Sequence, residues 1–188
     1  LIGIITSMVA DQEYMAGNYK NLLASSEIKY LSFISKLIIF LLLGGFSTIL
    51  AVIGFYVGFS FIENDTLPFS MYLAVVGLLI GSNIFLYVLH FFLSLRFSKG
   101  VSIGVGIVES LISALFLTGM GDGRWPFFPS SWSIRFIGYL VMKYQNISGA
   151  FTESDLYLGI IISIVGTILS LIIMLLWFTN WEGKKAEE

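Results

Sequence analysis

Four stretches of this sequence are long, apolar and almost free of charge, and they constrain the fold more than any other feature. A helix needs about 20 predominantly apolar residues to cross a bilayer. Apart from tyrosines, the only ionisable side chains in the four stretches are His90 and Glu109. We therefore expect an all-α polytopic membrane protein, a helical bundle forming a single transmembrane domain over residues 1–188. The expected spans are residues 37–62, 66–95, 100–121 and 156–181.

The composition agrees with this class and excludes several others. Charged residues make up 12% of the chain, whereas soluble domains average roughly 25%. The absence of cysteine excludes disulfides and thiolate chemistry, and a single histidine excludes a multi-histidine metal site. The net charge of -2, with no basic cluster beyond Lys184 and Lys185, does not favour nucleic acid. We expect no metal or cofactor in this chain. Because no G-x-x-x-x-G-K-[ST] motif occurs, any ATP would be bound by another polypeptide.

The first ten residues are apolar but too few to span a bilayer, and they lack the basic segment of a signal peptide. We interpret residues 1–10 as the end of a spanning helix whose beginning is missing. The chain begins with Leu1 rather than methionine, so we expect it to be incomplete at its N-terminus.

Lysine and arginine in short connections predict the orientation of the spans, because cytoplasmic connections carry an excess of these residues. Seven basic residues fall in residues 11–36, 96–99 and 182–188, against three in residues 122–155. We therefore expect the first three segments, including the C-terminal tail, in the cytoplasm and residues 122–155 outside.

The expected outer segment opens with "GMGDGRWPFFPSSW", residues 119–132. Tryptophan and phenylalanine gather at the membrane–water boundary, and prolines cannot continue a helix. A helical pattern resumes over residues 132–143, but its uncharged part between Arg135 and Lys143 is too short to span. We expect an interfacial or re-entrant helix there; a purely structural loop is the alternative. Asp122 with Arg124 reads most simply as a surface turn.

The expected cytoplasmic segment carries an amphipathic pattern. Met15, Tyr19, Leu22 and Leu23 follow the spacing of one helical face. This pattern predicts a short helix between two spans, which could rest on the membrane surface or dock into a groove of a cytoplasmic partner.

Glu109 is the most costly residue of the sequence, because a charge at the centre of a span costs roughly 2.5–3.5 kcal/mol. It could contact a cationic substrate or act as a conformational latch. The simpler alternative, which we favour slightly, is a neutral carboxyl bonded to Asn83, Ser82 or Ser113. We interpret His90 as an interfacial packing residue rather than a proton relay.

Three pairs of glycines at four-residue spacing allow close helix approach in lipid; we expect them to pack against helices of the same chain, and a dimer face is the alternative. The pairs are Gly54–Gly58, Gly77–Gly81 and Gly100–Gly104.

Two segments resemble a known family. "DQEYMAGNYKNLLAS", residues 11–25, resembles the cytoplasmic turn of ABC exporter permeases of the drug- and polysaccharide-exporting type. Residues 104–136 are more specific: a helix rich in small residues ends in T-G-x-G-D-G-x-W and is followed by prolines and W-x-I-R-F. This pattern is similar to the permease subunits of lantibiotic self-protection (immunity) transporters, and most of all to their MutG type.

The resemblance implies six spans, the second leading into a coupling helix and an interfacial element preceding the last. This chain departs from that pattern because a first span is missing. It also implies a permease rather than an enzyme, in the cytoplasmic membrane of a Gram-positive bacterium. Its implied partners are cytoplasmic ATPase subunits in two copies, which bind ATP and Mg²⁺, a second identical or homologous permease, membrane lipid, and a lantibiotic-type peptide as substrate.

The resemblance also implies two sets of site residues. The set implied to contact the ATPase comprises Asp11, Glu13, Tyr14, Gly17, Tyr19, Lys20, Leu22 and Leu23. The set implied to line the substrate path or outer gate comprises Glu109, Asp122, Arg124, Trp125, Phe127, Trp132 and Arg135. Two other hypotheses stay open: the same fold exporting another peptide, a lipid or a drug, and a membrane scaffold or regulator that transports nothing.

Overall fold

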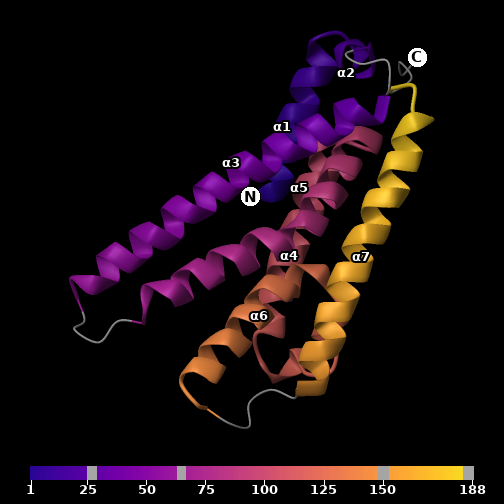
Figure 1. Ribbon diagram of the computed structural model, residues 1–188. Coiled ribbons are helices and arrows are strands. Elements are labelled where there is room, and N and C mark those ends of the chain that lie inside the picture. Colours follow the sequence, from indigo (N-terminus) through magenta and orange to yellow (C-terminus); the bar gives the residue numbers. More distant parts are fainter. Residues whose placement is uncertain (25–28, 63–66, 148–152, 184–188) are drawn as a thin grey trace.

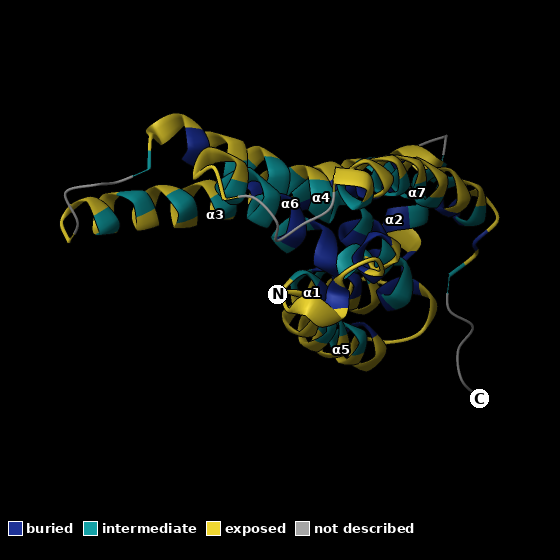
Figure 2. Ribbon diagram, turned by 90° about the horizontal axis from the view of Figure 1, so that it is seen from below, coloured by how far each residue is buried: buried dark blue, intermediate teal, exposed yellow. Residues whose placement is uncertain are grey.

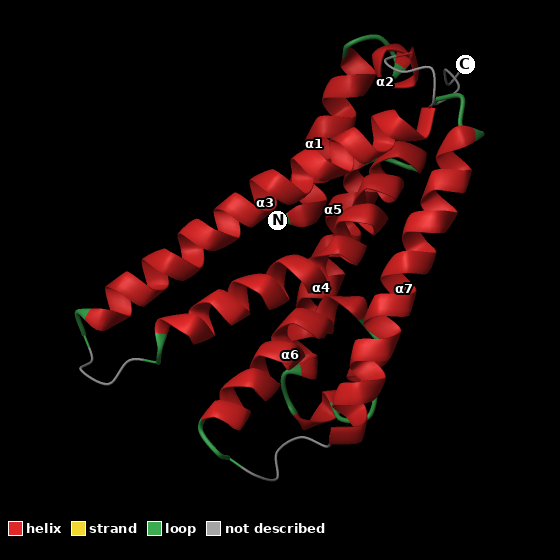
Figure 3. Cartoon of the chain, viewed as in Figure 1, coloured by secondary structure: helices red, strands yellow, loops and turns green. Residues whose placement is uncertain are grey.

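The computed structural model describes residues 1–24, 29–62, 67–147 and 153–183, and every regular element in these ranges is helical (Figure 3). Four helices, α3, α4, α5 and α7, are long and apolar enough to cross a membrane. The prediction of an all-α, multi-pass membrane protein is therefore confirmed. The elements are α1 (Ile2–Met15), α2 (Lys20–Ala24), α3 (Lys29–Ser60), α4 (Phe69–Arg96), α5 (Lys99–Phe116), η1 (Gly119–Gly121), η2 (Trp125–Phe127), α6 (Pro129–Tyr144) and α7 (Glu153–Thr179).

Two helix boundaries differ from the expected ones for identifiable reasons. Helix α3 begins at Lys29 instead of residue 37, because the bundle satisfies the charge that lies in its second turn: Lys36 Nζ donates to Glu13 Oε1 at 2.5 Å. Helix α5 ends at Phe116 instead of residue 121, because the hydroxyl of Thr118 accepts from the amide of Met120 and starts the short 3-10 helix η1. The connection 63–66 and the basic pair Lys184 and Lys185 lie outside the described residues.

The chain connections gather at two opposite ends of the bundle (Figure 1). At one end, Tyr19 beside α2 packs on Trp181 just after α7, with ring centroids 5.0 Å apart. At the other end, the amide of Gly123 donates to Asp155 Oδ2, at the start of α7, at 3.0 Å. The described connections at each end are those that the lysine and arginine counts assigned to one side of the membrane.

Two clusters of buried side chains hold the helices together. The larger joins α1, α2, α3, α4 and the end of α7, and stacked aromatic rings dominate it: Phe33 and Phe91 lie 5.2 Å apart between centroids. The smaller lies among α5, η2 and α6 and comprises Phe116, Trp125, Trp132 and Phe136. The C-terminal half of α3 is mostly exposed in the single chain (Figure 2), as expected for an apolar surface facing lipid or another subunit.

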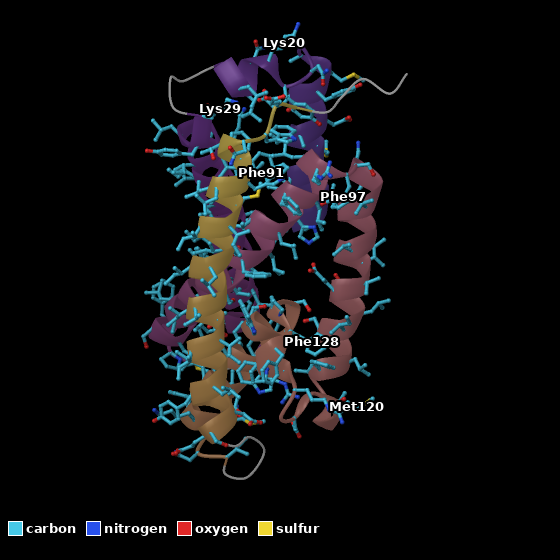
Figure 4. All side chains as sticks on the ribbon, turned by 90° about the vertical axis from the view of Figure 1, so that its right-hand side faces the viewer. Lys20, Lys29, Phe91, Phe97, Met120 and Phe128 are labelled. Carbon is cyan, nitrogen blue, oxygen red and sulfur yellow. The ribbon has the colours of Figure 1, made fainter. Side chains whose placement is uncertain are left out.

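The chain between α5 and α6 runs toward the middle of the bundle as irregular backbone. Helix α6 then runs back toward the same end. The ring of Trp125 fits against Gly159 of α7, whereas the ring of Trp132 reaches Gly166. Gly166 lies about 10 Å further along α7, at a rise of 1.5 Å per residue. Figure 4 likewise shows Phe128 further into the bundle than Met120. Helix α6 contacts α4, α5 and α7, and the irregular segment is buried at Gly121, Trp125 and Pro126. Non-helical chain within a membrane requires such cover.

The expectation that the three glycine pairs pack within the chain is wrong. Among the described residues, a Cβ at any of the six glycines would meet nothing closer than Ser98 Oγ, 3.8 Å from Gly100. Close approach occurs instead at glycines that the pattern did not single out: a Cβ at Gly44 would lie 1.9 Å from the Tyr87 hydroxyl, and one at Gly159 2.0 Å from Trp125. The four-residue spacing does not show which face of a helix is occupied, and here it marks open faces.

Candidate functional site

The residues implied as sites fall in three separate places. The set implied to contact an ATPase lies in an elbow, defined as residues 11–23, where α1 ends and α2 begins. Glu109 lies in the middle of α5 beside His90 of α4. The other outer residues lie on η1, η2, α6 and the turns joining them. The cavity beside Glu109 is also lined by Ser130 and Ile134 of α6.

The elbow is a sharp turn and not the single amphipathic helix that the sequence predicted. Gly17, Asn18 and Tyr19 all have positive φ, at 133°, 52° and 65°. The amide of Asn18 turns back to the carbonyl of Tyr14, and that of Tyr19 to the carbonyl of Glu13, so acceptors at the end of α1 are satisfied. The turn breaks the predicted apolar face: Met15 is 80% exposed, whereas Tyr19 is 2% exposed. Left-handed backbone is costly for non-glycine residues and persists only where the surroundings fix it.

The surroundings of the elbow supply that constraint. Tyr19 packs between Trp181 and Tyr14, with ring centroids 5.0 and 5.6 Å away. Leu22 is buried in the larger cluster and Leu23 packs on it. Glu13 pairs with Lys36 at 2.5 Å, and Asp11 approaches Lys99 at 3.8 Å. The elbow is therefore joined to α3, to α5 and to the end of α7.

The free face of the elbow is its tip. Tyr14 and Met15 are exposed apolar side chains, Lys20 is exposed beside them, and Gly17 has no described neighbour within 4 Å of a Cβ position. A surface of this kind can bind another protein and pass a displacement to three spanning helices through the contacts above.

Burial of Tyr19 has a consequence at high pH. Burial first, then the charge of Asp11, then Tyr14, raises the pKa of Tyr19 to about 12. In the unfolded chain a tyrosine titrates near pH 10, so the unfolded state loses its proton first as the pH rises. The stability contributed by the neutral phenol is therefore complete below about pH 10 and lost between about pH 10 and 12.

We expect the thermal unfolding midpoint of the wild type to fall more steeply over this pH window than that of Tyr19→Phe. The measurement is thermal unfolding in detergent at several pH values. Tyr144→Phe, an exposed tyrosine at the opposite end, should follow the wild type. Equal pH slopes for the wild type and Tyr19→Phe would contradict the burial argument.

His90 and Glu109 form a polar pair between α4 and α5. His90 Nε2 lies 2.7 Å from Glu109 Oε2, and His90 Nδ1 lies 3.1 Å from Ser102 Oγ. The Ser102 hydroxyl also lies 3.3 Å from the carbonyl of Gly3 in α1. With Glu109 ionised, Nε2–H donates to the carboxylate, and Nδ1 either accepts from the serine or donates to it. A neutral or a protonated histidine both satisfy this network.

The pair borders a small cavity. A cavity of about 330 Å³ is lined by residues of α1, α4, α5 and the start of α6, among them His90, Glu109, Ser110 and Ser130. His90 is 2% exposed and Glu109 19%. The expectations for both residues are therefore wrong: the described partner of Glu109 is His90 and not Asn83, Ser82 or Ser113, and His90 is a buried hydrogen-bonding group instead of an interfacial one.

A third site anchors the outer segment. Arg135 of α6 is 1% exposed and donates to three acceptors: Nε to the carbonyl of Phe116 at 2.5 Å, Nη2 to that of Thr118 at 2.7 Å, and Nη1 to Asp122 Oδ1 at 2.9 Å. The carbonyl of Phe116 is at the end of α5, where helix carbonyls lack internal partners, whereas that of Thr118 also accepts from the amide of Gly121. Asp122, Gly123 and Arg124 form an exposed turn, as the sequence suggested, and the ion-pair partner of Asp122 is Arg135.

The remaining outer residues divide by burial. Trp125 and Trp132 are buried, and the indole of Trp132 donates to the carbonyl of Pro126 at 2.8 Å. Arg124 and Phe127 are exposed. Buried rings and a buried guanidinium hold this segment in place, and Arg124, Phe127 and Asp122 face outward.

Lys36, His90, Ser102 and Trp181 contact the implied sites but were not assigned to them from the sequence. A signal for His90 existed: tyrosines aside, it is the only ionisable side chain in the predicted spans besides Glu109. Trp181 carried no such signal, because its contact with Tyr19 depends on how α7 packs. Among the described residues, no group of three His, Cys, Asp or Glu side chains is placed to hold a metal ion.

Comparison with known proteins adds no assignment: no protein-family model, curated protein or solved structure matches the chain. The fold defines a class, an all-α multi-pass membrane protein.

Proposed function

We propose that this chain is a permease subunit of an ATP-driven exporter in the cytoplasmic membrane of a Gram-positive bacterium. Its spans carry a lantibiotic-type peptide out of the membrane and thereby confer self-immunity. ATP and Mg²⁺ are bound by two copies of a separate cytoplasmic ATPase, and a second permease subunit completes the complex.

The observation that supports this proposal is the elbow. It projects from one end of the bundle, presents Tyr14 and Met15 to the exterior, and contacts three spanning helices through Lys36, Lys99 and Trp181. A displacement of the tip by an ATPase would reach these helices together. The basic connections Arg96–Lys99 and the end of α7 lie at the same end, which agrees with a cytoplasmic position under the positive-inside rule.

The peptide substrate is supported by the sequence resemblance in residues 104–136. The pairing of Glu109 with His90 makes contact between Glu109 and a cationic substrate a weaker proposal than the latch, because the carboxylate already has a partner. In the latch, the pair would hold α4 to α5 in one conformation and separate in another.

The first test concerns the ATPase. Glu13 is a poor position for this test, because its change would also break the ion pair with Lys36. Met15→Asp places a charge on the exposed tip and leaves the internal contacts in place. We expect affinity purification of the tagged chain from native membranes to recover a subunit with Walker motifs with the wild type and to lose it with Met15→Asp.

The matched control is Met120→Asp, an exposed methionine in η1 at the opposite end of the bundle. This variant should recover the ATPase as the wild type does. Recovery with Met15→Asp, or no Walker-containing subunit with the wild type, would refute the proposal. Growth of a deletion strain with a panel of lantibiotics tests the substrate separately. If deletion left the sensitivity unchanged while the wild-type chain still bound the ATPase, the exporter assignment would stand and the peptide substrate would be rejected.

A further inference from the structure

A second and larger cavity is unrelated to the sites above. A groove of about 900 Å³ lies between α4, α6 and α7, in the half of the bundle that holds α6 in Figure 1. Cavities that bind drug-sized ligands measure about 300–1,000 Å³. This groove is at the upper end of that range.

Small residues create the groove. Gly77 and Gly81 of α4 line it, and a Cβ at either would meet no described atom within 4 Å. On the facing helix α7, Ser163 and Thr167 line it with short side chains. The glycine spacing that failed to predict packing within the chain therefore marks an open cavity wall.

The wall of the groove is apolar despite its hydroxyl groups. Ser82 donates to the carbonyl of Leu78, Ser163 to that of Ile160 and Thr167 to that of Ser163. Each hydroxyl proton is thus used by its own helix, so these side chains offer a ligand mainly carbon. An apolar molecule in the groove would leave none of these donors unpaired.

Charge is confined to one end of the groove. Lys143, in the last turn of α6, and Glu153, in the first turn of α7, both line it and are exposed. Within the described part of the chain, neither has an ion-pair partner. The groove runs along α7 from Glu153 to Ile168, about 22 Å at 1.5 Å per residue. One leaflet of a bilayer core is about 15 Å thick, so the groove reaches from a headgroup level past the middle of a leaflet.

We propose that the groove binds one zwitterionic phospholipid with an ammonium headgroup, such as phosphatidylethanolamine. The headgroup phosphate contacts Lys143, the ammonium contacts Glu153, and an acyl chain lies along Gly77 and Gly81 between α4 and α7. A cation and an anion at the same mouth match a headgroup that carries both charges better than one that carries only a phosphate. The inference stands whether or not the chain is an exporter subunit.

The test is native mass spectrometry of the protein purified in mild detergent from membranes that contain phosphatidylethanolamine and phosphatidylglycerol. We expect one retained phosphatidylethanolamine per chain in the wild type. Gly81→Trp should lose it, because the indole fills the groove. Gly58→Trp on α3 is the matched control: Gly58 is equally open but lies outside the groove, and the variant should retain the lipid.

The two headgroup contacts are tested by substitutions at Lys143 and Glu153. Both residues are exposed, so these substitutions do not endanger folding. Lys143→Ala should lower phosphatidylethanolamine affinity about fivefold, the factor that one basic residue near a membrane surface contributes. Exchanging the charges, Lys143→Glu with Glu153→Lys, should retain the lipid more than either single change. Equal retention by Gly81→Trp and Gly58→Trp, or equal retention of phosphatidylglycerol by the wild type, would overturn the proposal, as would a bound peptide in place of lipid.

Discussion

Arg135→Leu is expected to lower the free energy of unfolding by about 1–3 kcal/mol, the cost of leaving a buried hydrogen-bond acceptor without its donor. Leucine fills part of the space but donates nothing. The buried carbonyl of Phe116 then loses its donor, whereas the carbonyl of Thr118 keeps the amide of Gly121. The end of α5 and the entry of the chain toward α6 should become disordered together.

Unfolding by a denaturing detergent, followed by tryptophan fluorescence, measures this change, because Trp125 and Trp132 lie in the affected cluster. Arg135→Lys should fall between leucine and the wild type, since an ammonium group cannot reproduce the fork geometry of the guanidinium. Arg124→Leu is the matched control because Arg124 is exposed in the same segment. Unfolding curves for Arg135→Leu and Arg124→Leu that coincide would reject the anchoring role.

A further variant separates the two kinds of contact that Arg135 makes. Asp122 is 55% exposed, so its ion pair is screened by solvent. Asp122→Asn should therefore cost under about 1 kcal/mol. The main contribution of Arg135 then comes from the backbone carbonyls at the end of α5.

The spans were predictable because their signal is local. Each requires only a run of apolar residues, and α3, α4, α5 and α7 all contain one. The boundaries were less predictable, since they depend on contacts between distant residues. Lys36 immediately precedes the apolar run of residues 37–62, yet it lies inside α3 because Glu13 is next to it in space.

The sequence predicted which segments form the sites, but not which residues contact one another there. The sequence indicated that residues 11–23 form a connection between helices, but it predicted one helix where the structure has a turn at Gly17, Asn18 and Tyr19. Gly17 and Asn18 tolerate a positive φ intrinsically, but Tyr19 does not, so residue type alone does not predict three consecutive positive values. The packing of Tyr19 in the larger cluster of buried side chains selects this backbone conformation.

Buried charge was the most informative single signal, but it did not identify its partner. Glu109 was recognisable because an acid in the middle of a span must be satisfied. Its partner could not be deduced from spacing alone, since serine and asparagine side chains in the same helices offered equally plausible bonds. The rotation of α4 about its axis decides between them, and that rotation is set by the aromatic cluster around Phe91.

The His90–Glu109 pair gives the second large effect, and here the double variant should be milder than one of the singles. His90→Leu is expected to cost about 3–5 kcal/mol, because it leaves the carboxylate of Glu109 without its partner inside the span. Glu109→Leu should cost less, about 1–3 kcal/mol, since it leaves only a histidine N–H unpaired. The double variant His90→Leu with Glu109→Leu should return close to the wild type, because apolar replacements of a buried ion pair are often neutral.

Unfolding measurements on the four proteins form a double-mutant cycle, and Glu109→Gln, which keeps a hydrogen-bond acceptor, is the conservative control. If His90→Leu were nearly neutral, the cavity beside Glu109 would be solvating the carboxylate with water and the pair would not be the main restraint between α4 and α5. The double variant also separates stability from transport. A latch must open and close, so a protein with a permanently apolar contact here should fold normally and fail to protect cells. Full protection by the double variant would assign the pair to stability alone.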